Sequence, residues 1–134
     1  MKARKIWIGH WVLGVAALHV AFGAVMGAGV MRGMLERGLF NSVDGNPMAM
    51  AITWFMLFGV PLALLGMTIT ALERAQALEA VARPMGWALL ALLAVCALLM
   101  PMSGFWLFLP PAIALLRRAA PAASQRAASA SASV

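Results

Sequence analysis

Groups that carry chemistry are scarce in this 134-residue chain, which has four acidic residues, two histidines and one cysteine. The single cysteine, Cys96, excludes a disulfide oxidoreductase, because thiol exchange within one chain needs a pair of cysteines. No CxxCH motif is present, so covalent attachment of a c-type haem is excluded as well. All four acidic residues fall in expected loops, which argues against a proton-coupled drug exporter, since such proteins use a carboxylate inside the membrane. The acidic residues are Glu36, Asp44, Glu73 and Glu79.

Charge is also missing from four long apolar runs, at residues 6–30, 48–72, 85–100 and 104–116. The hydrocarbon core of a membrane is about 30 Å thick and a helix rises about 1.5 Å per residue, so about 20 residues cross it. The first two runs meet that length, whereas the last two are shorter and need their flanking residues. Hydrophobic residues make up 64% of the chain and charged residues 10%, against about 45–50% and about 25% in soluble domains. The sequence therefore predicts an all-α integral membrane protein, an up-and-down bundle of four transmembrane helices.

The distribution of basic residues orients the expected helices. Eight of the ten lie before the first run, between the second and third, or after the fourth. Only Arg32 and Arg37 lie on the opposite side, and cytoplasmic segments carry the excess of Lys and Arg. We therefore expect both termini in the cytoplasm, with residues 1–118 forming a transmembrane domain in the bacterial inner membrane. Residues 119–134, rich in Ala and Ser, are expected to be a disordered cytoplasmic tail.

The net charge of +6 does not indicate nucleic acid as a partner, because no basic face alternates with stacking aromatic residues. The expected partner is the lipid bilayer. Gly23 and Gly27 form a small-xxx-small pair, a spacing that lets two helix backbones approach closely in lipid. Two interpretations of this pair stay open: packing against the second span within the chain, or a contact between copies in a homo-oligomer.

Residues that favour turns, and prolines, separate or interrupt the four apolar runs. Residues 41–47 are good turn and cap formers. Pro84 is expected to start the third span, and residues 101–103 to form a tight outer hairpin. Pro110 and Pro111 are expected to shorten or bend the fourth span.

Two histidines lie inside the expected first span. His10 lies between Trp7 and Trp11 near the cytoplasmic interface, where it is expected to anchor the helix. His19 lies about 21 Å into the membrane, slightly beyond its midplane. An ionisable residue at that depth is a candidate functional group. Its two interpretations are a neutral imidazole hydrogen-bonded to another helix, and a group that binds a ligand or carries a proton.

Other polar and aromatic residues gather on the outer side and could line an outward-facing pocket with His19. No metal or cofactor is predicted. The two histidines lie on opposite faces of one helix, so one chain cannot supply both axial ligands of a haem from it. A haem held by one histidine or shared between copies stays open, and the scattered methionines indicate packing rather than a copper(I) site. The candidate ligand pocket comprises His19, Asn41, Asp44, Trp54, Ser103 and Trp106.

Several different short motifs lie along residues 6–118. They are FNxVxG at residues 40–45 and PxSGFW at residues 101–106, with the segment GVAALHVAFG at residues 14–23 and a Trp-Phe pair at residues 54–55. By these motifs the chain resembles an uncharacterised bacterial family of small four-span integral membrane proteins. The resemblance implies the fold and the inner-membrane location, and it implies no activity.

On these grounds we expect a structural or accessory component of the inner membrane. The alternative is a binder or enzyme for a small hydrophobic ligand (lipid-like, quinone-like or haem) that uses the outward-facing pocket around His19. The sequence leaves open whether the protein is an enzyme. It specifies no substrate, protein partner or oligomeric state.

Overall fold

The structure, a computed structural model, describes residues 5–43 and 45–119 of the chain. Within these residues every regular element is a helix and there is no strand, which confirms the all-α prediction. The expected tail lies outside the described residues, except that residue 119 ends the last helix. The elements are α1 (Ile8–Met26), α2 (Ala28–Arg37), α3 (Pro47–Arg74), α4 (Glu79–Leu99), the 3-10 helix η1 (Gly104–Phe108) and a last helix over residues 109–119.

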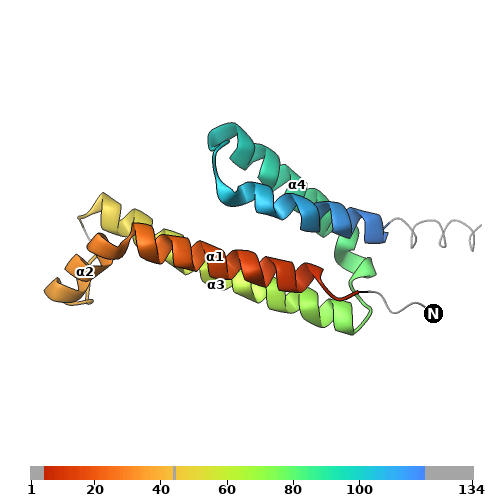
Figure 1. Ribbon diagram of the computed structural model, residues 1–134, viewed down its shortest axis with the longest axis horizontal. Coiled ribbons are helices and arrows are strands. Elements are labelled where there is room, and N and C mark those ends of the chain that lie inside the picture. Colours follow the sequence, from red (N-terminus) through yellow and green to blue (C-terminus); the bar gives the residue numbers. More distant parts are fainter. Residues whose placement is uncertain (1–4, 44, 120–134) are drawn as a thin grey trace, which may run out of the picture.

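Two antiparallel helix pairs make up the fold (Figure 1). In the first pair α1 lies along α3, and in the second α4 lies beside the last helix, which follows η1. The pairs meet at the end that holds residues 73–79 and diverge toward the opposite end. The core draws on both pairs, and Ile8 and Val12 of α1 and Leu115 of the last helix are fully buried in it. The fold is therefore a helical bundle in which both pairs pack together at one end.

Glycines allow α1 and α3 to approach each other closely. A Cβ atom on Gly9 would collide with backbone atoms of Gly66 and Thr70. Gly23 and Gly27 likewise face side chains of α3. Small residues at a helix contact permit this approach in lipid. Packing within the chain, the first of the two interpretations, is therefore what the structure shows for Gly23 and Gly27, and a homo-oligomer contact through them stays a prediction.

Three of the described helices, α1, α3 and α4, are long and apolar enough to cross a membrane. The expected fourth span, residues 104–116, is not one helix of that kind, because η1 takes its first five residues and the last helix follows. Pro110 and Pro111 lie in the first turn of the last helix, where a missing N–H group removes no helical hydrogen bond. The two prolines thus start a short helix. Within the described residues, then, three helices rather than four have the length and apolar composition of a span.

The turn before α3 ends in a well-formed cap, as its residue types predicted. The side-chain oxygen of Asn46 accepts hydrogen bonds from the backbone N–H groups of Met48 and Ala49, each at 3.1 Å. Pro47 occupies the first helical position, where its fixed φ and missing N–H fit the helix. This local sequence therefore fixes where α3 begins.

The prediction that Pro84 starts the third span is wrong, because α4 begins five residues earlier, at Glu79. The residues before Pro84 include good helix formers such as alanine. Leu78, which precedes the helix, is 2% exposed and belongs to the core. Burial of this side chain places the start of α4 at the packed end of the bundle.

Candidate functional site

His19 lies on α1 and faces α3. Its Nε2 atom is 2.7 Å from the carbonyl oxygen of Phe55. Because a carbonyl oxygen only accepts, Nε2 carries the proton and donates this hydrogen bond. The imidazole also stacks on the Phe55 ring, with centroids 4.0 Å apart and an angle of 23° between the planes. This geometry matches the packing interpretation of His19, and a ligand role stays a prediction.

The other residues of the candidate pocket fall into two separate groups. Trp54 lies near the start of α3 and Asn41 in the turn between α2 and α3, and Trp54 is 69% exposed. Ser103 and Trp106 lie at the turn of the second pair, where Trp106 Nε1 donates a 2.8 Å hydrogen bond to the carbonyl oxygen of Pro101. Figure 1 shows these two turns on diverging hairpins. The structure therefore does not bring the described pocket residues together, and Asp44 lies outside the described residues.

A second polar cluster is built around one of the acidic residues that the sequence placed in loops between the apolar runs. Glu73 and Glu79 lie in helices because α3 and α4 extend beyond the second and third apolar runs, and Glu36 lies in the separate short helix α2. Glu36 belongs to α2, Glu79 starts α4, and Glu73 lies in the last turn of α3. Of these, Glu73 is 7% exposed and is the one acidic residue buried within the described part of the chain.

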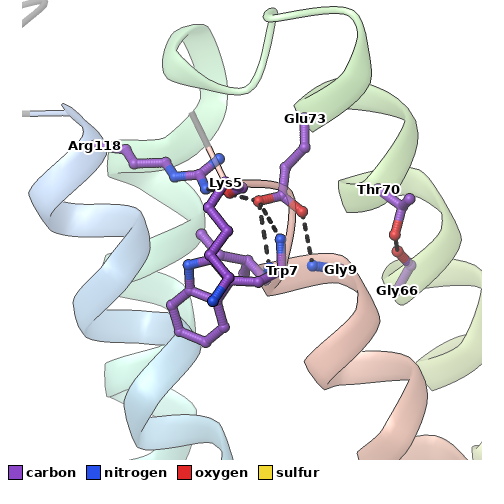
Figure 2. A network of polar contacts seen from close by, with 8 residues as sticks. Lys5, Trp7, Gly9, Gly66, Thr70, Glu73 and Arg118 are labelled. Carbon is purple, nitrogen blue, oxygen red and sulfur yellow. Dashed lines mark hydrogen bonds and ion pairs between the residues drawn. The ribbon is translucent and has the colours of Figure 1, made fainter. Parts of the chain in front are cut away.

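The Glu73 carboxylate lies at the N-terminal end of α1 (Figure 2). Its Oε1 accepts hydrogen bonds from the backbone N–H groups of Trp7 and Ile8, each at 3.3 Å, and its Oε2 accepts one from Gly9 at 3.0 Å. The first N–H groups of a helix have no partner inside it, and the helix dipole favours negative charge there. No side chain at Trp7 caps α1. Glu73 therefore supplies from α3 the cap that α1 lacks in its own sequence.

Arg118 of the last helix completes this cluster (Figure 2). Its guanidinium lies 2.8 Å from Glu73 Oε1 and donates a 2.7 Å hydrogen bond to the carbonyl oxygen of Lys5. The side chain of Glu73 is fully buried and that of Arg118 is 14% exposed. A buried carboxylate needs a paired charge or hydrogen bonds to offset its lost hydration. The cluster therefore joins the start of α1, the end of α3 and the last helix.

Groups of the protein contact both oxygens of the Glu73 carboxylate. A carboxylate has about four acceptor positions, and three backbone N–H groups and one guanidinium contact this one. Three of these contacts are to Oε1 and one, from Gly9, is to Oε2, so both oxygens are held by groups of the protein itself. Within the described residues there is also no group of three or more His, Cys, Asp or Glu that could hold a metal ion. The arrangement is suited to holding helices together.

One signal in the sequence could have identified this contact. The residues before α1 are Lys5, Ile6 and Trp7, and none of them has the short polar side chain that normally caps a helix. A helix that starts without such a residue needs an acceptor from elsewhere in the chain. Glu73, directly after the second apolar run, is a carboxylate on the same expected side of the membrane.

Comparison with known proteins gives a family and no activity. No curated protein matches the chain, and no solved structure matches it. A family model with the description "Family of unknown function (DUF6463)" matches residues 3–122. The chain therefore belongs to this family of unknown function.

Proposed function

We propose that the protein is an integral component of the bacterial inner membrane, with both termini in the cytoplasm and a structural or accessory role. The surfaces of the three apolar helices support the membrane location. Val25 of α1, Leu64 of α3 and Leu98 of α4 are each more than half exposed, and they are three of many such large apolar side chains. Exposed apolar surface of this extent is unfavourable in water and is matched by lipid.

A fourth crossing is supported by the direction of the last helix. It lies antiparallel to α4, because a Cβ atom on Gly86, near the start of α4, would meet Leu116 of the last helix. The five residues of η1 and the eleven of the last helix would extend about 26 Å at 2.0 and 1.5 Å per residue. That length is slightly less than a hydrocarbon core of about 30 Å. Arg117, which is exposed in the last turn of this helix, can extend its charged group to the headgroups.

The structural role rests on one observation: the buried ion pair of Glu73 and Arg118 joins helices of the bundle. Glu73 and Arg118 direct their charged groups to backbone atoms and to each other. His19 likewise bonds to the backbone of the neighbouring helix. Groups that would serve catalysis or transport in other membrane proteins are used here to join helices.

The test compares purified wild-type protein with the His19→Gln variant. For an accessory component we expect no visible absorbance band in either sample. We also expect native mass spectrometry to show no quinone or haem. A chromophore or quinone that binds the wild type and is lost from His19→Gln would contradict the proposal. That result would favour the alternative function, binding or conversion of a small hydrophobic ligand.

A further inference from the structure

A surface groove lies between the start of α1 and the last helix, beside the Glu73–Arg118 cluster. Its volume is about 580 Å³. The Trp7 indole forms one wall and lies beside the last helix (Figure 2), whose residues form the other wall. Trp7 meets the ring of Trp11 edge-on, with centroids 6.3 Å apart, and Trp11 Nε1 donates a 2.8 Å hydrogen bond to the carbonyl oxygen of Leu107. These contacts hold the two walls of the groove together.

One end of the groove is charged, and the rest of its wall along the last helix is apolar. Arg117, Ile113 and Leu109 all line it, and because they are four residues apart they share one face of the last helix. From Leu109 to Arg117 the helix rises about 12 Å. A basic group is thus followed along the helix by apolar side chains, in the order in which a phospholipid presents its phosphate and its acyl chain.

The two arginines of the groove differ in their partners. Arg118 is engaged by Glu73. Arg117 is exposed and makes no ion pair or hydrogen bond with any residue in the described ranges. This end of the bundle is also basic overall, with five basic and two acidic side chains among its described residues. They are Lys5, Arg74, Arg83, Arg117 and Arg118, and Glu73 and Glu79.

We propose that this groove binds one anionic phospholipid from the cytoplasmic leaflet, with the phosphate at Arg117 and an acyl chain along Ile113 and Leu109. The guanidinium offers several donors in a plane that matches phosphate oxygens. Tryptophan is favoured at the level of the headgroups, and basic pockets between transmembrane helices on the cytoplasmic side bind anionic headgroups. The inference rests on the membrane location and orientation under Proposed function.

The test titrates detergent-purified protein with phosphatidylglycerol or phosphatidylcholine and measures bound lipid by native mass spectrometry. We expect one phosphatidylglycerol to bind several-fold more tightly than phosphatidylcholine. Arg117→Gln should weaken phosphatidylglycerol binding about fivefold, the effect of one basic residue near an anionic lipid surface. Arg83→Gln is the matched control, because Arg83 is also exposed at this end but does not line the groove. It should change the affinity less than twofold.

A second variant tests the apolar part of the groove. Ile113 is 38% exposed, so Ile113→Trp should fold while filling the space for the acyl chain. We expect it to weaken binding of both lipids. Equal binding of the two lipids by the wild type, or equal effects of Arg117→Gln and Arg83→Gln, would overturn the lipid site.

Two further measurements separate the remaining explanations. Inorganic phosphate added in excess should leave phosphatidylglycerol bound, and displacement would show a site for free phosphate and overturn the proposal. Alkaline carbonate extraction of cell membranes tests the proposed function on its own. Protein that stays in the membrane but shows no lipid preference overturns only the lipid site, whereas protein released by carbonate overturns the membrane location.

Discussion

At the scale of single residues, the buried carboxylate of Glu73 has the largest expected effect on stability. Glu73→Gln keeps the size of the side chain but removes the charge that faces Arg118 and the N-terminus of α1. Breaking one partner of a buried ion pair leaves the other charge uncompensated. We expect the free energy of unfolding in micelles to fall by about 3 kcal/mol, measured by denaturant titration followed by circular dichroism.

The control for this substitution is Glu36→Gln on α2. Glu36 pairs with Arg32 at 3.4 Å, but the two side chains are 68% and 83% exposed. An exposed pair on one helix contributes less than about 0.5 kcal/mol. The Glu73→Gln substitution should also cost less in an Arg118→Gln background, because no unpaired guanidinium is then left. Equal losses for Glu73→Gln and Glu36→Gln would contradict the capping role.

The hydrogen bond from His19 to Phe55 gives a second prediction at this scale. In His19→Gln the amide N–H can still donate to the carbonyl oxygen of Phe55, so we expect little change in thermal stability. In His19→Leu the donor is lost, and an interhelical hydrogen bond in a membrane contributes at most about 2 kcal/mol. Thermal unfolding of both variants in the same detergent measures the difference. A loss for His19→Gln as large as that for His19→Leu would contradict a simple packing role.

The local sequence indicates which chemical groups His19 and Glu73 carry, but not which distant groups they contact. His19 was identifiable because an ionisable group within an apolar run is conspicuous by itself. The role of Glu73 depends on backbone N–H groups 64 to 66 residues away. No periodicity or spacing within a single segment encodes that contact. For this reason the cluster was not predicted from the sequence.

At the scale of secondary-structure elements, the contact of α1 with α3 depends on how closely their backbones approach. A methyl group in Gly9→Ala would meet backbone atoms of Gly66 and Thr70, which cannot move aside as a flexible side chain can. We expect a loss of about 1–3 kcal/mol in the free energy of unfolding, as for other overpacked contacts. Denaturant titration in micelles measures it.

The same helix contains the control for this prediction. A Cβ atom on Gly14 meets nothing within 4 Å, and alanine favours helix over glycine by up to about 1 kcal/mol. Gly14→Ala should therefore leave stability unchanged or raise it slightly. Destabilisation of both variants to the same extent would show that the close contact at Gly9 is not what matters.

The predictability of each element follows from how local its signal is. The second apolar run, 48–72, gave α3 (Pro47–Arg74) to within two residues at each end, because a charge-free run and a strong Asn-Pro cap are local features. The start of α4 was missed because it depends on burial of Leu78 against distant residues. The fourth run was expected to be shortened or bent at Pro110 and Pro111, but apolar composition alone did not show that its first five residues form the 3-10 helix η1.

At the scale of the whole molecule, the proposed topology can be tested with reporter fusions. An enzyme active only in the periplasm should be active when fused near Asp44 or Ser103, and inactive when fused after Arg118, since cytoplasmic segments carry the excess of basic residues. A reporter active only in the cytoplasm should give the opposite pattern and serves as the control. Periplasmic activity after Arg118 would indicate an odd number of crossings and contradict the four-span model.

The overall arrangement explains why the predicted pocket did not assemble. Residues from two turns were expected to share one outward-facing site, which assumes that all four helices stay together along their length. The hairpins instead diverge away from the packed end (Figure 1). Hydrophobic pattern shows which segments are helical and apolar, but the angle between two helix pairs depends on side-chain packing between them. That information is spread over residues far apart in the chain.

The cap that Glu73 provides for α1 has a consequence for the order of synthesis. Trp7 is made 66 residues before Glu73, which at 5 to 20 residues per second is an interval of about 3 to 13 s. During that interval the first N–H groups of α1 lack the carboxylate that accepts their hydrogen bonds in the folded protein. In the proposed topology the return of α3 to the same side supplies this carboxylate, and Arg118 reaches the ion pair only after the last helix has been made. The first helix to be synthesised is thus fixed in place by the two later helices that return to its starting side.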